Sequence, residues 1–381
     1  MAIDGPAAHD EECMADAVRL AARARRRTAP NPWVGCVLVR DGAVVGAGAT
    51  EPPGGPHAEA VALAVAGEAA RGATAYVTLE PCSHHGRTPP CADALVDAGV
   101  RRVVVALSDP DPRVAGEGIA RLRAEGIAVD LGVGADAVAQ QLAPYLHHRR
   151  TGSAFCLAKT ALSVDGRTAA ADGSSQWITG PAARADAHGL RADSQAVVVG
   201  SGTALADRPA LTVRDADPLP EHPPLRVLLD ARGRVPAEGP LFDAAAPTMV
   251  ITTERAPVVA TDAWRAAGAK VETVPDADGK VDLRHALATL GAHGVLQALV
   301  EGGAALHGAL LAAGLVDRLT VYVGAALLGA QGKPGLDWPG PASIADAPRL
   351  RLVGTAVLGD DVRLDYVRLD DARAPLTVGG P

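Results

Sequence analysis

Three side chains able to bind a single metal ion stand in three different predicted elements of this sequence. His57 lies at the start of a predicted helix, Cys82 follows a predicted strand, and Cys91 opens the next helix. One imidazole and two thiolates would leave the fourth position of a tetrahedral zinc ion open, as catalytic rather than structural zinc requires. Helix N-termini also favour the thiolate form of cysteine. If these residues share one ion, the fold has to bring two helix starts and one strand end together.

An acidic residue accompanies the first of these ligands. Glu59 lies two residues after His57, close enough to reach a metal-bound water without binding the metal. The order His-x-Glu, Pro-Cys and a second cysteine is the signature of zinc-dependent base deaminases, in which the glutamate is the general acid and base. A His-x-Glu pair alone is a weak signal, and the cysteines could be core thiols or part of a structural site completed by His84 or His85. The combined order favours catalysis, with the two histidines shaping the substrate pocket.

Composition and charge narrow the classes of function. The 381 residues suffice for two domains, and a net charge of −8 with 3% aromatic residues argues against nucleic-acid binding. The basic run 23–27 fits the last turn of a helix. The sequence predicts neither a membrane span nor a secretory signal. Five scattered cysteines fit reduced thiols better than disulfides, so we expect a cytoplasmic protein.

Helices and strands alternate along the chain, which predicts sheets covered by helices. Asp10 is expected to cap a helix that runs to about Arg26, a hairpin is expected around Asp41-Gly42, and a helix over residues 135–148 is expected to end the first half. The pattern restarts near residue 150. We therefore expect two α/β domains, residues 10–149 and 150–372.

A glycine pair in the second half is compatible with nucleotide binding. Gly302 and Gly303 stand between a predicted strand and a predicted helix, where backbone N–H groups can hold a phosphate. The spacing is not that of the dinucleotide fingerprint, and the glycines could equally make only a tight turn. The residues alone leave both interpretations open.

Longer motifs resemble one known family. "PNPWVGCVLV", "PHAE" and "TLEPCSHHGRTPPC" closely resemble the deaminase domain of the bifunctional riboflavin-biosynthesis deaminase/reductases, and the eight residues between the two cysteines are specific to that family. "KTALSVDGRTA", "SQWITG" and "VEGGAALHGALLAAGLVD" look like its reductase domain, which is similar to dihydrofolate reductase. The resemblance implies a cytidine-deaminase-like three-layer α/β/α domain followed by a dihydrofolate-reductase-like α/β domain.

The resemblance also implies two successive reactions. The first is zinc-dependent hydrolytic deamination of 2,5-diamino-6-(5-phosphoribosylamino)pyrimidin-4-one, and the second is reduction of the ribosyl side chain to ribityl by NADPH. The partners would be small phosphorylated pyrimidines, with no nucleic acid and no membrane, and the chain would form a homo-oligomer, either a dimer or a tetramer.

The resemblance also implies roles for the residues of this chain that match the family's motifs. Glu59 would be catalytic, and zinc would be bound by His57, Cys82 and Cys91. The deaminase substrate would contact Asn31, Arg87 and Asp109. NADPH would contact Ala161, Trp177, Thr203, Asp207 and Gly303. The reductase substrate would contact Ser175, Arg191, Leu211, Arg214 and Glu301.

Three positions depart from the family pattern. Ala49-Thr50 stands where the family usually has a histidine, Asp111 where asparagine is frequent, and Arg208 where an acid is usual. These departures leave the zinc ligands and Glu59 unchanged, but they could alter contacts with phosphate, ribose or cofactor.

Overall fold

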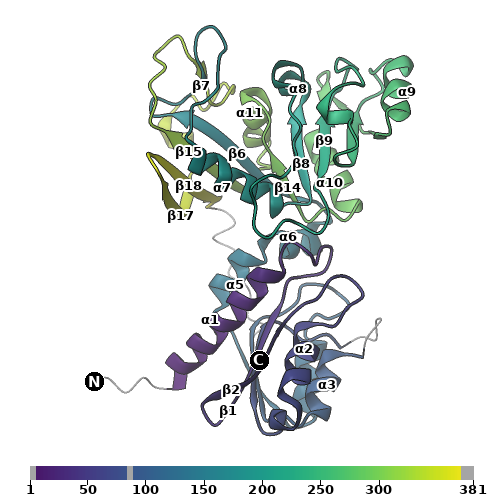
Figure 1. Cartoon of the computed structure of the whole chain (residues 1–381), viewed down its shortest axis with the longest axis vertical. Helices are drawn as coiled ribbons and strands as arrows, with labels where there is room; N and C mark the ends of the chain where they lie inside the picture. The colour runs from purple at the N-terminus through teal and green to yellow at the C-terminus, as the bar shows by residue number, and fades with distance from the viewer. Residues whose placement is uncertain (1–5, 84–88, 370–381) are drawn as a thin grey trace. The chain divides into compact units, whose positions relative to one another are not determined.

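The computed structural model describes residues 6–83 and 89–369 of the chain (Figure 1). The chain divides between Gly152 and Ser153 into two compact units, each considered by itself below. None of the helices in the described ranges is long and apolar enough to cross a membrane.

The first unit is a five-stranded sheet with the strand order β2-β1-β3-β4-β5. The antiparallel pairs join β1 (Gly35–Arg40) to β2 (Ala43–Ala49) and to β3 (Thr74–Leu79). The parallel part continues through β4 (Arg102–Leu107) to β5 (Ala128–Leu131). The β1–β2 hairpin is confirmed, and Asp41 and Gly42 at its tip have φ values of 53° and 78°.

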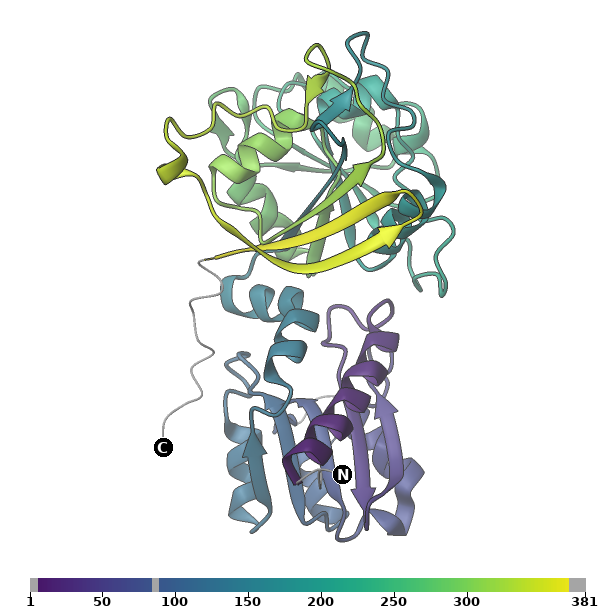
Figure 2. The same ribbon diagram turned by 90° about the vertical axis from the view of Figure 1, so that its left-hand side faces the viewer.

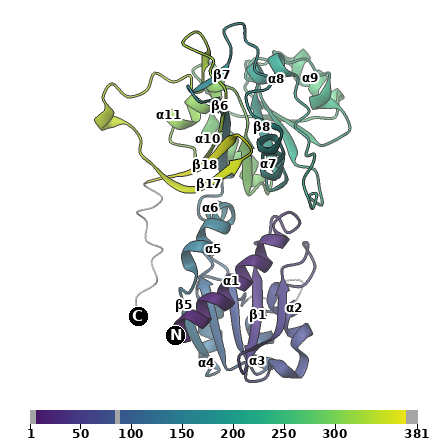
Figure 3. The same ribbon diagram turned by 60° about the vertical axis from the view of Figure 1, so that its left-hand side comes forward.

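Helices cover both faces of this sheet (Figures 1 and 3). One face carries α1 (Pro6–Ala24) and α5 (Ala135–Gln141), and the other carries α2 (Ala58–Ala66), α3 (Cys91–Asp97) and α4 (Glu117–Ala124). A short 3-10 helix, Gly67–Ala70, follows α2, and α6 (Ala143–Thr151) ends the unit. The expected three-layer arrangement is therefore confirmed.

Two glycines in β2 allow α2 to lie directly on the sheet. A Cβ at Gly46 would sit 2.3 Å from the carbonyl oxygen of Ala62, and one at Gly48 would sit 2.7 Å from that of Ala58. Any larger residue would push the helix outward, since both obstacles are backbone atoms. These glycines therefore fix the helix whose N-cap is His57.

Two predicted helix limits in this unit were wrong. Because α1 begins at Pro6, Asp10 lies inside the helix rather than at its cap, and its carboxylate accepts a hydrogen bond from Tyr76 (2.7 Å) and pairs with Arg102 (2.7 Å). The single helix expected over residues 135–148 is two helices, α5 and α6, separated by Leu142. Pro144 explains the break, since it has no N–H to donate and its ring clashes with the carbonyl four residues earlier.

The second unit contains a nine-stranded sheet with the order β11-β10-β9-β8-β14-β6-β15-β18-β17. Its parallel strands are β6 (Phe155–Ser163), β8 (Ala196–Gly200), β9 (Leu225–Leu229), β10 (Thr248–Thr252), β11 (Lys270–Thr273), β14 (Gln297–Val300) and β15 (Arg318–Gly324). Two small antiparallel pairs accompany it, β7 (Arg167–Ala169) with β16 (Lys333–Pro334) and β12 (Asp276–Ala277) with β13 (Lys280–Val281).

Both faces of this sheet are buried. Along β8, Ala196 and Val198 pack into one hydrophobic core, whereas Val197 and Val199 pack into the other. The first core includes side chains of α10 (Leu283–Ala292) and α11 (Ala304–Ala312), and the second includes those of α8 (Ser201–Asp207) and α9 (Val258–Ala266). This two-sided burial explains why the strand is apolar throughout, as parallel strands usually are.

A long C-terminal hairpin, β17 (Leu350–Leu358) and β18 (Asp361–Arg368), pairs antiparallel with β15 (Figure 2, yellow). This hairpin was not predicted from the sequence, because most of its residues are only half-buried and charged side chains interrupt its apolar pattern. The remaining helix, α7 (Pro181–Ala192), contacts β18.

Candidate active sites

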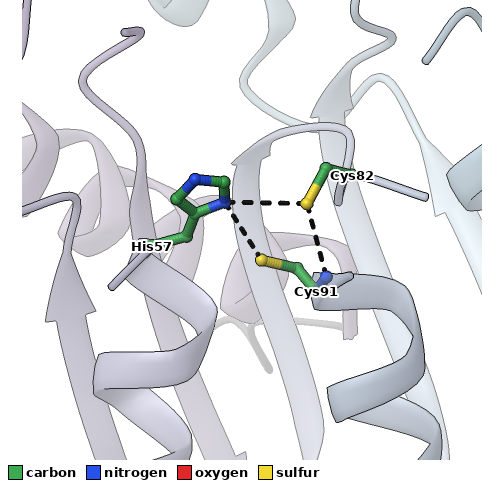
Figure 4. A group of neighbouring side chains, drawn as sticks. All are labelled: His57, Cys82 and Cys91. Atoms are coloured by element: carbon green, nitrogen blue, oxygen red, sulfur yellow. Dashed lines mark hydrogen bonds between the residues drawn. The ribbon is translucent and has the colours of Figure 1, made fainter. Parts of the chain in front are cut away.

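The three expected metal ligands meet in the first unit. The Nδ1 atom of His57 lies 3.6 Å from Sγ of Cys82 and 3.3 Å from Sγ of Cys91, with the side chains pointing toward one another (Figure 4). Within the described part of the chain, these three side chains form a group that could hold a metal ion. Zinc bonds of about 2.3 Å to sulfur and about 2.0 Å to nitrogen place tetrahedral ligand atoms ~3.5 Å apart. The donor atoms therefore fit a zinc ion.

Three different elements deliver these ligands. His57 is the N-cap of α2, Cys82 follows β3, and Cys91 is the first residue of α3. The backbone N–H of Cys91 points at Sγ of Cys82 (3.4 Å), so a helix N-terminus stabilises that thiolate. The contact between the two cysteine side chains lowers the pKa of Cys82 and raises that of Cys91.

Glu59 is buried beside the ligands. It is the second residue of α2, its side chain is 3% exposed, and its carboxyl interacts with His57, Cys82 and Cys91. Burial, followed by the charge of Cys82, raises the pKa of the Glu59 carboxyl to about 7. A carboxyl of this kind can both accept and donate a proton near neutral pH.

A second buried carboxylate organises the same edge of the sheet. Glu80 accepts four backbone hydrogen bonds of 3.0–3.2 Å, from Asp109, Gly116, Gly118 and Ile119. These bonds join the segment before Cys82 to the loop that follows β4 and to the first turn of α4. Because β3 and β4 are parallel neighbours, their carboxyl ends lie at one edge of the sheet, and the bonds of Glu80 connect the segments that follow them.

The expected contacts of the deaminase substrate are only partly described. Asp109 lies in the loop after β4, where Tyr145 donates to its carboxylate (3.0 Å), and burial raises its pKa. Asn31 is half-buried between α1 and β1. Arg87 lies outside the described residues, as do His84 and His85.

Two of the departures in this unit have local partners. Thr50 is buried, and its hydroxyl accepts a hydrogen bond from the backbone N–H of Val34 (3.1 Å). Asp111 forms two hydrogen bonds with the guanidinium of Arg113 (2.9 and 2.6 Å), and this contact lowers the pKa of Asp111 to about 2.

The second unit has a cavity of about 560 Å³ at the carboxyl ends of β8, β9 and β14. Thr203, Asp207 and Gly303, which were expected to contact NADPH, all line it. The Thr203 hydroxyl accepts a hydrogen bond from the Gly303 N–H (2.8 Å), which joins α8 to the N-terminus of α11. Ligands of open α/β sheets bind in this position, outside the carboxyl ends of parallel strands.

A half-buried ion pair lies in the same unit. The Arg191 guanidinium donates two hydrogen bonds to the Glu301 carboxylate (2.6 and 2.7 Å). Lys159 lies near enough for its charge to stabilise the ionised Glu301. Although burial opposes ionisation, the charges of Arg191 and Lys159 outweigh it and lower the pKa of Glu301 to about 2.

The other expected contacts of the reductase lie in strands, loops and the core. Ala161 is in β6, Ser175 is in an exposed loop, and Trp177 is 67% exposed with the Arg184 guanidinium 4.5 Å from its ring. Arg214 is exposed, and its backbone N–H donates to Nδ1 of His188 (3.1 Å). The Leu211 side chain is buried in the core, so its backbone would have to make any contact with a substrate.

Comparisons with known proteins identify both halves of the chain. The cytidine and deoxycytidylate deaminase zinc-binding region matches residues 7–107, and the RibD C-terminal domain matches residues 154–364. The riboflavin biosynthesis protein RibD of Escherichia coli K12 is 44% identical, over 94% of this chain and 99% of that protein. The chain belongs to the RibD family.

Solved RibD structures match nearly the whole length of the chain. Acinetobacter baumannii RibD is 39% identical with a TM-score of 0.85, over 95% of this chain and 99% of that one. A second relative is a diaminohydroxyphosphoribosylaminopyrimidine deaminase/5-amino-6-(5-phosphoribosylamino)uracil reductase of Thermotoga maritima. It is 30% identical with a TM-score of 0.83, over 96% of this chain and 100% of that one. The chain is thus a bifunctional RibD deaminase/reductase of riboflavin biosynthesis, with zinc and NAD(P)H as its cofactors.

Several polar residues near the two sites were not predicted from the sequence. Glu80 and Tyr145 support the deaminase edge, and Arg232, Arg234 and Lys280 line the cavity of the reductase unit. The sequence "VLLDARGR" (residues 227–234) carried a usable signal, since the acid after a strand is followed by arginines two and four residues later.

Proposed function

We propose that residues 10–149 form a pyrimidine deaminase and that residues 150–372 form an NADPH-dependent reductase acting on its product. The last three of these residues lie outside the described part of the chain. The substrates would be 2,5-diamino-6-(5-phosphoribosylamino)pyrimidin-4-one and the uracil derivative formed from it, in keeping with the activities that name the Thermotoga maritima relative. The buried Glu59 beside the ligand triad is the observation that carries the proposal.

In the deaminase, His57, Cys82 and Cys91 would hold zinc and leave one position open. Bound zinc supplies an activated water at neutral pH. Glu59 would take the proton of this water and pass it to the departing amine, and its raised pKa suits both transfers. Asn31, Arg87 and Asp109 would orient the pyrimidine and the phosphoribosyl group.

In the reductase, the cavity would bind NADPH through Thr203, Asp207 and Gly303, with Ala161 and Trp177 as further contacts. The N-terminus of α11, directly after Gly303, offers free backbone N–H groups to a phosphate. Ser175, Arg191, Leu211, Arg214 and Glu301 would hold the substrate. NADPH supplies the hydride, and the protein supplies position and electrostatics.

One assay tests both halves. The purified chain is given the diaminopyrimidine substrate and NADPH, and both ammonia release and oxidation of the nicotinamide are followed. The proposal requires both signals, with oxidation dependent on prior deamination. Ammonia without NADPH oxidation would refute the reductase assignment alone, and absence of ammonia from zinc-loaded protein would refute the deaminase assignment.

We also propose a cytoplasmic homo-oligomer, a dimer or a tetramer. The five cysteines are all free thiols, which suits a reducing compartment. Sedimentation of the purified chain would determine its oligomeric state.

A further inference from the structure

A lysine without a hydrogen-bond partner lies beside the pair Arg191–Glu301. Lys159 is the central residue of β6 and is half-buried, and its ammonium forms neither a hydrogen bond nor an ion pair with the described residues. The charged or titratable groups that face it are Glu301 after β14, Arg191 of α7 and His307 of α11. Burial lowers the pKa of Lys159. Because an ammonium group has three N–H donors, this one can serve a bound ligand.

The aromatic ring of Tyr322 attracts this ammonium. The Nζ atom of Lys159 lies 5.5 Å from the centroid of the ring, within the range of a cation–π interaction. Tyr322 is in β15 and is only 1% exposed. It shares a face of the sheet with Lys159, since the parallel ladder pairs Tyr322 with Ala161 and Thr320 with Lys159. The contact therefore follows from the register of β6 and β15.

The far end of the Tyr322 ring is fixed by α7 and the C-terminal hairpin. Its hydroxyl donates to Asp186 of α7 (2.5 Å), and Arg363 of β18 donates to the same carboxylate (3.0 Å). Arg363 stands directly opposite Tyr322 in the β15–β18 ladder. Asp365 accepts hydrogen bonds from Arg363 (3.1 Å) and from the buried hydroxyl of Thr320 (2.6 Å). These bonds leave the ring one orientation.

The charges around Tyr322 balance one another. Three cations and three anions, all half-buried, lie along this row of side chains: Lys159, Arg191, Arg363, Glu301, Asp186 and Asp365. Charges taken out of water recover their desolvation cost only in part by pairing, so such a group is typical of a functional site. Arg191 and Arg363 each have a carboxylate within hydrogen-bond distance, whereas Lys159 has the ring alone.

We propose that Tyr322 is a positioning residue of the reductase, which holds the ammonium of Lys159 toward the substrate beside Glu301. Asp186 and Arg363 fix the tyrosine, so the C-terminal hairpin supports the site through side chains that do not touch the substrate. This inference rests on the proposed function, because it assumes that the substrate lies at the pair Arg191–Glu301.

A spectrum of the full-length protein tests the contact without any substrate. The chain has only four lysines, so protein made with lysine carrying carbon-13 at Cε gives four signals, and Lys159→Arg identifies the one of interest. In the wild type the Hε protons of Lys159 should be shifted upfield by the ring current. In Tyr322→Leu this shift should disappear. The pKa of Lys159, read from the titration of Cε, should fall by about one pH unit, because the ring no longer stabilises the charged form.

Oxidation of NADPH by the deaminated intermediate tests the consequence for the reaction. Tyr322→Leu should lower kcat/KM for the intermediate about tenfold, and the basic limb of its pH profile should move to lower pH together with the pKa of Lys159. Tyr322→Phe keeps the ring and loses only the bond to Asp186, so about threefold is expected. The KM for NADPH should stay within about twofold in both variants, which reports a folded unit.

The matched control is Tyr366→Leu. Tyr366 lies in β18, pairs with Leu319 and packs against the core on the opposite face of the sheet. Its replacement also removes an aromatic ring from this end of the sheet, but it should leave the Lys159 signal, kcat/KM and the pH profile as they are in the wild type.

Two results would overturn the inference. A wild-type Lys159 signal without a ring-current shift would show that the ring does not hold the ammonium, and this result requires no variant to fold. A signal that changes in Tyr322→Leu while kcat/KM and its pH profile do not would make the contact purely structural. Wild-type protein that does not oxidise NADPH with the intermediate would instead refute the proposed reductase function, whatever the spectrum shows.

Discussion

Gly118 lies so close to Pro81 that a Cβ on this glycine would sit 1.9 Å from the proline's carbonyl oxygen. Pro81 directly precedes the zinc ligand Cys82, and the N–H of Gly118 donates to Glu80 (3.0 Å). The first turn of α4 therefore packs against the segment that carries Cys82 and holds it in place.

We predict that Gly118→Ala displaces Cys82 and weakens zinc binding. Overpacking of this kind costs about 1–3 kcal/mol, because backbone has to move. Zinc affinity, measured by competition with a chromogenic chelator, should fall about tenfold or more, and ammonia release with it. The control is Glu117→Ala, an exposed neighbour in the same helix, which should bind zinc as the wild type does. Unchanged affinity in Gly118→Ala would show that α4 does not position the ligand.

The half-buried pair Arg191–Glu301 should make the stability of the second unit fall in acid. The pKa of Glu301, about 2 in the folded protein, lies below its ordinary value of 4.5, so the pair contributes stability above about pH 4.5. This contribution, on the order of 3 kcal/mol, is lost as the pH falls from 4.5 toward 2. Urea unfolding of wild type and Glu301→Gln should therefore differ at neutral pH and converge in acid.

The matched control for this prediction is Glu238→Gln. Glu238 is an exposed acid whose nearest cation, Arg208, is 3.9 Å away, and exposed pairs contribute little. It should unfold as the wild type does at every pH. If the difference in free energy of unfolding between wild type and Glu301→Gln stayed constant from pH 7 to pH 3, the loss of stability in acid would not be due to this pair.

Removal of zinc should separate the two activities. Each unit has its own core, and the triad lies wholly in the first unit. Treatment with a chelator should abolish ammonia release, because the activated water is lost, and zinc should restore it. Oxidation of NADPH by the deaminated intermediate should persist within about twofold of the untreated rate. Its loss on zinc removal would show that the second unit depends on the metal.

The sequence specified the zinc triad well because its signal is chemical. The types of the ligand residues and their order can be recognised even where the predicted helix limits are wrong. His57, Cys82 and Cys91 come together in the structure as expected. Helix limits were less accurate, since Asp10 has the chemistry of a cap but is used in an ion pair with Arg102, a residue 92 positions away. Such distant partners leave no local pattern.

The sequence indicates only part of the basic lining of the cavity in the reductase unit. Lys280 reaches the cavity from a hairpin far along the chain from Arg232 and Arg234, and only the fold brings the three together. The role of Asp230 was equally hidden, because its burial and its three backbone hydrogen bonds depend on the loop's conformation.

The most direct test of the account is the ammonia-release rate of Glu59→Gln together with its zinc content. Glutamine has nearly the same shape as glutamate but cannot take a proton from water or pass one to the leaving amine. We predict one zinc ion per chain and a rate reduced by about 10²–10⁴, the usual contribution of a general acid and base. A zinc-loaded variant that releases ammonia at the wild-type rate would contradict the catalytic role of Glu59.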